Sequence, residues 1–190
     1  MILACIALSA WACNGADSSG DDSVDTSPTP RPAATVEGSN VFFSAKGYNA
    51  RIPDGWSFDD NAVNAPGLSV DTFLAPAEEG QIVQPNVGVS CEQPDSAETP
   101  DVDTYAAARK ETAVRLGAKN LAEDSLDVDG QPARMLTYDM EREGASFQRS
   151  ELLLISQRCL FSIAFTITPE KAGELTPVFQ QFLEDFEVVN

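Results

Sequence analysis

The fold is decided by residues 121–141, LAEDSLDVDGQPARMLTYDME, in which two extended segments flank a tight turn. Leu121–Val128 and Ala133–Glu141 both carry apolar residues in alternation with polar ones, as half-buried β-strands do. The dipeptide Asp129-Gly130 between them favours a two-residue hairpin turn, because Asp and Gly tolerate a positive φ. The stretch therefore predicts an antiparallel pair of strands.

Alternation and turn residues predict further strands on both sides of this hairpin. They are Val41–Ala45, Tyr48–Pro53, Leu68–Ala75, Asn86–Glu92, Phe147–Gln157 and Leu160–Thr168.

Two helices are also predicted. The first is capped by Asp101 or Asp103, runs through Leu116 and is stopped by Gly117. The second starts at Thr176-Pro177, and its apolar residues recur at offsets of three and four, which places them on one face that packs against the sheet. Those residues are Leu175, Val178, Phe179, Phe182, Leu183 and Phe186. Because no regular βαβ alternation is present, we expect an α+β fold with a mainly antiparallel sheet and helices packed on its faces.

The N-terminus predicts export and a lipid anchor. Residues 1–13 read as a signal peptide that ends in a lipobox-like Cys13, the residue expected to carry the lipid. A basic segment before the apolar one is missing, which a start upstream of Met1 would explain. Cys5 would be the acceptor only with a longer N-terminus, and the alternative is an uncleaved apolar stub. The expected location is the extracytoplasmic face of the cell membrane.

Residues 14–39 are rich in Ser, Asp, Thr and Pro, which predicts a disordered acidic linker that spaces residues 40–190 from the membrane. The remaining stretch, 40–190, is long enough to fold as one domain without a metal or disulfide.

Charge and missing residue types exclude several functions. The chain carries 30 acidic and 12 basic residues, a net charge of −18, which repels phosphate backbones and makes nucleic acid an improbable partner. Histidine is absent, and with it the most common general base and transition-metal ligand. Since no CxxC, GxSxG, GxGxxG or Walker pattern occurs, we assign no catalytic residue, no metal site and no cofactor.

The two cysteines of the domain form the sharpest pair. Cys91 shares a strand face with Val87 and Val89, and Cys159 shares one with Phe161 and its alternate neighbours, so both sulfurs point into an apolar core. In an oxidising compartment they could form a disulfide that closes a long loop. Two separate buried thiols are the alternative.

For the other candidate residues, both a functional and a purely structural interpretation are possible. Seven loop acids could supply a hydrolase's paired carboxylates or merely surface charge: Asp59, Asp60, Glu78, Glu79, Glu98, Asp101 and Asp103. Asp124, Asp127 and Asp129 before Gly130 suggest a calcium loop, but the first and twelfth positions are Ser125 and Leu136, which favours a hairpin turn. Trp56 could stack on a ligand or close the core.

Several segments resemble the PsbP/DcrB-like superfamily in the same order along the chain. They are Tyr48–Trp56 with its Pro53-Asp-Gly55-Trp56 turn, Pro85–Val89, the helix after Asp101, Gly130–Arg134 with Tyr138, and Pro177–Phe186. The resemblance implies a PsbP-like α/β/α sandwich. Its members include a photosystem II extrinsic subunit, bacterial envelope lipoproteins and a Ran-binding factor. They share no activity, so the resemblance implies no site residue.

The sequence thus favours a membrane-anchored, non-catalytic lipoprotein whose domain binds an envelope protein or a small ligand of unknown identity. The alternative is an envelope hydrolase that uses loop carboxylates. Two close, buried acids in a cleft would favour the hydrolase, and a continuous apolar surface patch would favour the binding protein.

Overall fold

The computed structural model describes residues 35–37, 40–59, 64–65, 68–93, 99–128, 130–156 and 159–189. The predicted leader, its lipidation residue Cys13 and the linker up to residue 34 lie outside these ranges and remain predictions. None of the helices within the described ranges is long and apolar enough to cross a membrane.

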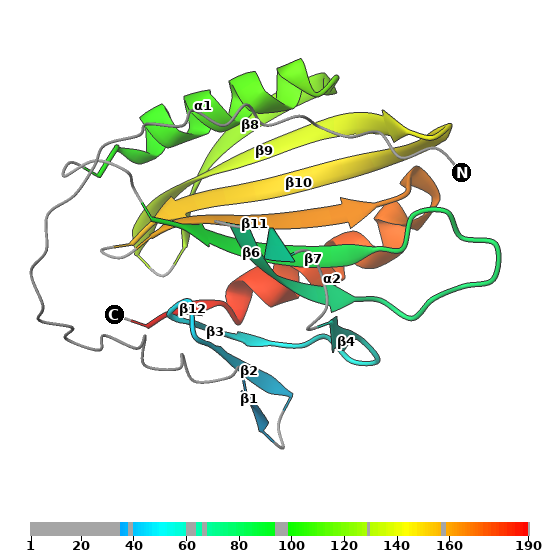
Figure 1. The fold of residues 1–190 in the computed structure, drawn as a ribbon, viewed down its shortest axis with the longest axis horizontal. Coiled ribbons are helices and arrows are strands. Elements are labelled where there is room, and N and C mark those ends of the chain that lie inside the picture. Colours follow the sequence, from blue (N-terminus) through cyan, green and yellow to red (C-terminus); the bar gives the residue numbers. More distant parts are fainter. Residues whose placement is uncertain are drawn as a thin grey trace, which may run out of the picture. The chain divides into compact units, whose positions relative to one another are not determined.

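A large antiparallel sheet forms the centre of the domain (Figure 1). Its strand order is β4-β6-β7-β11-β10-β9-β8, and β5 pairs with β6. These strands are β4 (Ser57–Asp59), β5 (Asn64–Ala65), β6 (Leu68–Leu74), β7 (Asn86–Glu92), β8 (Lys119–Val128), β9 (Gln131–Arg142), β10 (Ala145–Ile155) and β11 (Leu160–Ile167).

A smaller antiparallel sheet has the order β1-β2-β3-β12. Its strands are β1 (Thr35–Glu37), β2 (Val41–Ser44), β3 (Tyr48–Arg51) and β12 (Glu187–Val188). Phe42 and Tyr48 from this sheet belong to the same buried cluster as Phe73 and Phe161 of the large sheet. The small sheet therefore packs on the large one through aromatic side chains.

The two helices cover opposite faces of the large sheet. Figure 1 shows α1 (Val102–Arg115) and α2 (Ala172–Glu184) on opposite sides of this sheet. Helix α1 buries Tyr105, Ala106 and Ala113 against one face, and α2 buries its aromatic residues against the other. Strand β10 contributes side chains to the cores on both faces of the sheet. Leu152 and Leu154 belong to the buried cluster on the α2 side, and Leu153 belongs to the cluster on the α1 side. The predicted α+β architecture is confirmed.

Local signals in the sequence account for several element boundaries. The Asp101 side chain caps α1 by accepting a hydrogen bond from the Thr104 amide at 2.7 Å, which decides between the two predicted caps. Gly117, at φ +93°, ends the helix as predicted. Gly130, at φ +72°, turns β8 into β9, where Val128 pairs with Gln131.

The predicted start of the second helix was wrong. Helix α2 begins at Ala172, after a 3₁₀ turn at Pro169–Lys171, and Pro177 lies inside it. An interior proline costs about 3 kcal/mol or more. Burial of Leu175, Phe179 and Phe182 contributes about 1.5–3 kcal/mol each, which outweighs that cost.

The predicted N-terminal boundary of the domain was also too late. Strand β1 pairs with β2, with Thr35 opposite Phe43 and Glu37 opposite Val41, although residues 14–39 were assigned to the linker. The fold therefore includes residues 35–37. Strands β4, β5 and β12 were missed as well, because two or three residues are too few to show an alternation.

Candidate functional site

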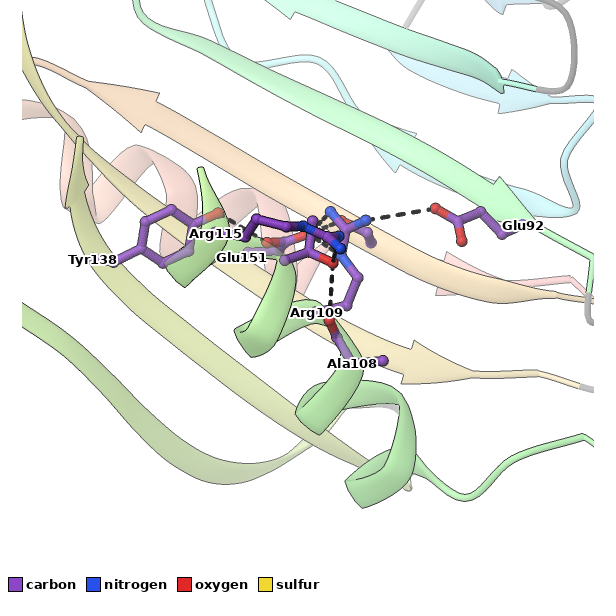
Figure 2. Close-up of polar contacts among 8 residues, drawn as sticks. Glu92, Ala108, Arg109, Arg115, Tyr138 and Glu151 are labelled. Atoms are coloured by element: carbon purple, nitrogen blue, oxygen red, sulfur yellow. Dashed lines mark hydrogen bonds and ion pairs between the residues drawn. The ribbon is translucent and has the colours of Figure 1, made fainter. Parts of the chain in front are cut away.

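A buried carboxylate marks the face of the large sheet that α1 covers. Glu151 of β10 is 1% exposed, and Arg109 from α1 donates to its Oε1 from Nε at 3.0 Å and from Nη2 at 2.5 Å (Figure 2). Ser162 Oγ donates to the same oxygen at 2.6 Å, and the Tyr138 hydroxyl donates to Oε2 at 3.1 Å. Four hydrogen bonds thus compensate for the loss of water around the charge.

The strand register and the helix period bring these groups together. Glu151 lies opposite Leu136 of β9 and Ala164 of β11, so Tyr138 and Ser162, two residues away on each strand, project from the same face. Arg109 lies three or four residues from Ala106, Tyr105 and Ala113, on the buried side of α1. The guanidinium therefore reaches the sheet beneath the helix.

The network keeps its groups in their usual charge states. Burial alone would raise the pKa of Glu151, but Arg109, Arg149 and the hydrogen bond from Ser162 outweigh it and lower the pKa. Burial and the negative charge of Glu151 raise the pKa of Tyr138 to about 12. Glu151 is therefore ionised and Tyr138 neutral at pH 7. An ionised carboxylate has no proton to donate, so Glu151 is not suited to act as a general acid.

A cleft of about 340 Å³ opens beside this network, between α1 and strands β9 and β10. We call it the α1 cleft. Its lining includes three arginines and three apolar side chains, namely Arg109, Arg142, Arg149, Leu116, Met140 and Phe147. Leu116, which lines the cleft, is 67% exposed, so one apolar side chain of the cleft is open to solvent.

Two buried polar atoms near Glu151 have no hydrogen-bond partner among the described residues. They are Nε of Arg149 and the hydroxyl of Tyr105. A buried polar group without a partner costs about 1–3 kcal/mol. In the described part of the chain Arg149 makes neither a hydrogen bond nor an ion pair, although it lines the cleft. Its Nε donor thus lacks an acceptor within the described residues.

A second buried carboxylate lies on the opposite face of the sheet. Asp71 of β6 is 8% exposed and forms an ion pair with Lys46. Its Oδ2 accepts hydrogen bonds from Ser44 at 2.6 Å and from the Tyr48 hydroxyl at 2.7 Å. Burial and Asp71 raise the pKa of Tyr48 well above its ordinary value. Because Lys46 lies in the β2–β3 turn, this cluster joins the small sheet to β6.

The carboxylates expected for a hydrolase are not brought together within the described residues. The two buried acids, Asp71 and Glu151, lie on opposite faces of the sheet, and each is paired with its own cation. Nor do three or more described Cys, Asp or Glu side chains gather as a metal would require.

Among the described residues, the loop acids predicted from the sequence do not form one group, because each has its own partner or lies in a different element. Glu78 pairs with Lys171 at 2.6 Å, Asp101 caps α1, and Asp103 pairs with Arg134 at 2.5 Å. Glu79 is exposed in the loop after β6, and Asp59 ends β4. Asp60 and Glu98 lie outside the described residues.

The calcium-loop acids occupy a hairpin, as the hairpin interpretation predicted. Asp127 accepts a hydrogen bond from the Gly130 amide at 2.8 Å, and Asp124 lies within β8 opposite Met135. Asp129 itself lies outside the described residues.

The two cysteines of the domain lie as the strand faces predicted. Val87, Val89 and Cys159 belong to the α2-side cluster, and Cys91 packs against it. Cys91 and Cys159 form a disulfide with their Cα atoms 5.4 Å apart, across 68 residues of sequence.

Trp56 contributes to the core, which is one of its two predicted roles, while the ligand-stacking role stays a prediction. It packs against the α2-side core, with its ring centroid 6.5 Å from that of Phe165. It also lines a second cleft of about 740 Å³, formed with Pro53, Pro177 and their neighbours between the β3–β4 turn and α2. Arg51 and Asp185 at this cleft lie 3.6 Å apart as an ion pair.

Sequence reasoning missed Arg109, Arg149 and Glu151. Glu151 could have been recognised because it directly precedes the apolar run Leu152–Ile155. An acid in a buried strand needs a cation nearby, since an unpaired buried charge is costly. The signal for Arg109 is its position among Tyr105, Ala106 and Ala113 on the buried side of α1.

No family model and no curated protein sequence matches the chain. Among solved structures, LpqN, described as involved in cell envelope biogenesis of Mycobacterium tuberculosis, aligns with a TM-score of 0.57 and 13% identity, covering 75% of this chain and 83% of LpqN. Cyanobacterial PsbP (CyanoP) from Synechocystis sp. PCC 6803 aligns with a TM-score of 0.56 and 18% identity, over 77% and 89% of the two chains.

The protein of unknown function PA94 from Pseudomonas aeruginosa aligns with a TM-score of 0.53 and 19% identity, covering 68% of this chain and 94% of PA94. The domain therefore has a PsbP-like fold, as the sequence resemblance implied. At these identities the similarity concerns the fold alone.

Proposed function

We propose that this protein is a non-catalytic binding protein of the cell envelope, held at the extracytoplasmic face of the membrane by a lipid on Cys13. The observation that carries the binding role is the α1 cleft, where Arg149, whose Nε has no partner among the described residues, shares the lining with the exposed Leu116. Clefts that combine an apolar lining with a few directed polar groups are typical ligand sites.

The location rests on features of the sequence and one of the structure. The apolar leader ends at Cys13, and an acidic linker of about two dozen residues follows it. A Cys91–Cys159 disulfide would persist in an oxidising compartment outside the cytoplasm. LpqN, which has a similar fold, is described as involved in cell envelope biogenesis, which is compatible with such a role.

The hydrolase alternative finds less support. A glycosidase-type mechanism needs two carboxyl groups roughly 5–10 Å apart across one cleft, with the pKa of one of them raised. In the described residues the two buried carboxylates lie on opposite faces of the sheet, and the pKa of Glu151 is lowered instead. We therefore favour binding over catalysis.

A capture experiment from the organism's own membranes tests the proposal. The full-length tethered protein is cross-linked and recovered in three forms: wild type, Leu116→Gln and Ile82→Gln. Leu116 borders the α1 cleft and is 67% exposed, whereas Ile82 is 73% exposed in the loop between β6 and β7, so the two substitutions remove similar apolar surface.

We expect a reproducible partner with wild type and Ile82→Gln that is lost or strongly reduced with Leu116→Gln. Recovery of the same partner by all three forms would place binding elsewhere. Recovery of no partner by any form would count against the binding role.

A further inference from the structure

We infer that the α1 cleft binds a small amphiphilic anion, whose carboxylate or phosphate group is held by Arg149 and whose apolar part lies against Met140, Phe147 and Leu116. This inference rests on the proposed function, since it assigns a ligand class to the same cleft.

The charge of the cleft opposes that of the chain. Its ionisable lining consists of three arginines and two glutamates, which gives +1, whereas the whole chain carries −18. Both glutamates are also engaged: Glu151 with Arg109, and Glu141 with Lys119 at 3.1 Å. An anion therefore finds a local positive site on a protein that otherwise repels it.

Arg149 is the cation best placed to hold the anion. Arg109 is already committed to Glu151, and Arg142 is exposed and 3.9 Å from Glu143. Arg149 extends from the same face of β10 as Glu151, is half-buried, and has no acceptor among the described residues. A planar guanidinium with free donors binds a carboxylate or phosphate through two parallel hydrogen bonds.

The neighbouring side chains define the rest of the ligand. Phe147 and Met140 are cross-strand partners on the face of Arg149, and Leu116 lies at the mouth of the cleft. A volume of about 340 Å³ is at the lower end for small-molecule sites. The cleft thus suits a short apolar or aromatic group attached to the anion.

The Trp56 cleft provides an internal contrast. It is larger, at about 740 Å³, but its charged lining consists of Arg51, Asp54 and Asp185, with a net charge of −1. Arg51 there is paired with Asp185. An anion should therefore discriminate between the two clefts, and Arg51 is a suitable control residue.

The test is calorimetric titration of the full-length chain carrying Cys13→Ala, which removes the predicted lipid acceptor. The probes are phenyl phosphate and benzoate, with inorganic phosphate lacking the apolar part and benzyl alcohol lacking the charge. Each is titrated into the parent chain and into Arg149→Gln and Arg51→Gln variants. Displacement by added anionic lipid vesicles distinguishes a lipid headgroup from a free small anion as the natural source of the charge.

We expect an aromatic anion to bind the parent chain and Arg51→Gln equally, and to bind Arg149→Gln at least about tenfold more weakly. Benzyl alcohol should not bind measurably, and inorganic phosphate should bind more weakly than phenyl phosphate. Equal binding by both variants, no binding of either aromatic anion, or equal affinity for inorganic and phenyl phosphate would overturn the inference.

If Arg149→Gln does not fold, the Nε–H resonance of Arg149 in the parent chain replaces it as the readout. This resonance should shift on titration with phenyl phosphate, and an unshifted resonance would contradict the assignment. If Leu116→Gln loses the membrane partner but no anion binds the parent chain, the proposed binding function is supported and only the assigned ligand class is wrong.

Discussion

Replacing Arg109 by methionine should destabilise the domain far more than removal of an ordinary surface charge. Methionine keeps the unbranched stem and the helix propensity of arginine, so the change removes mainly the guanidinium. Glu151 is then a carboxylate with 1% exposure that has lost two of its four hydrogen bonds. Removal of one partner of a buried ion pair lowers the free energy of unfolding by about 3–5 kcal/mol.

Because Ser162 and Tyr138 still donate to Glu151, we expect a loss near the lower limit, about 3 kcal/mol in the free energy of unfolding. Urea denaturation at pH 7 measures it. The matched control is Lys110→Met at the next residue of α1, where the pair with Glu123 is 43% and 32% exposed. Such a pair contributes at most about 1 kcal/mol.

The pH dependence of the loss tests the reasoning further. The pKa of Glu151 is lowered in the fold, so its stabilising contribution is present above the ordinary pKa of 4.5 and disappears as the pH falls through the lowered value. Removal of Arg109 raises the pKa of Glu151 in the variant, so the difference between wild type and Arg109→Met should narrow as the pH falls from that raised pKa through the lowered pKa in wild type. Glu151→Gln added to Arg109→Met should recover part of the stability, because an amide carries no charge to bury.

A loss at pH 7 no larger than that of Lys110→Met would contradict the expected cost of leaving the Glu151 charge without Arg109. A difference that stays constant from pH 7 to pH 3 would also contradict it, since the cost would then not come from the Glu151 charge.

Three further predictions concern the cysteines and the second buried pair. Reduction of the Cys91–Cys159 bond should raise the intact mass by that of two hydrogen atoms, and an unchanged mass would exclude the bond. The double Ala variant should lose about 4 kcal/mol of stability by the chain-entropy model. Replacing Cys13 with Ala should release the protein from membranes, and continued membrane partition would show that Cys13 is not the anchor. Lys46→Met should cost about 3 kcal/mol in urea denaturation, because it leaves Asp71 buried and unpaired; a loss below about 1 kcal/mol would show that the pair is not essential to the fold.

Regular alternation and turn residues predicted the long elements of this fold. Asp129-Gly130, flanked by eight or more residues of alternating strand on each side, has one compatible hairpin register, and the β8–β9 pairing follows it. The short strands carry no such pattern, because β1 and β12 exist only through pairing with β2 and β3. Their positions depend on tertiary contacts, which the local sequence pattern does not reveal.

The candidate site was harder to foresee for a different physical reason. Arg109 and Glu151 are 42 residues apart, and their meeting depends on how α1 lies across β10. Cys91 and Cys159 are 68 residues apart, yet their faces were predictable, because strand alternation fixes which side each sulfur takes. Helix orientation on a sheet has no comparable rule, so the α1 cleft emerged only from the structure.

The most direct test of the binding role is site-specific photo-cross-linking of the full-length protein in living cells. A photoreactive amino acid is placed at Leu116, beside the α1 cleft, and in a separate variant at Ile82, which is similarly exposed away from it. We predict a discrete cross-linked product from position 116 that position 82 does not give. Products of equal yield at both positions, or a product at position 82 alone, would contradict the assignment of the α1 cleft as the binding surface.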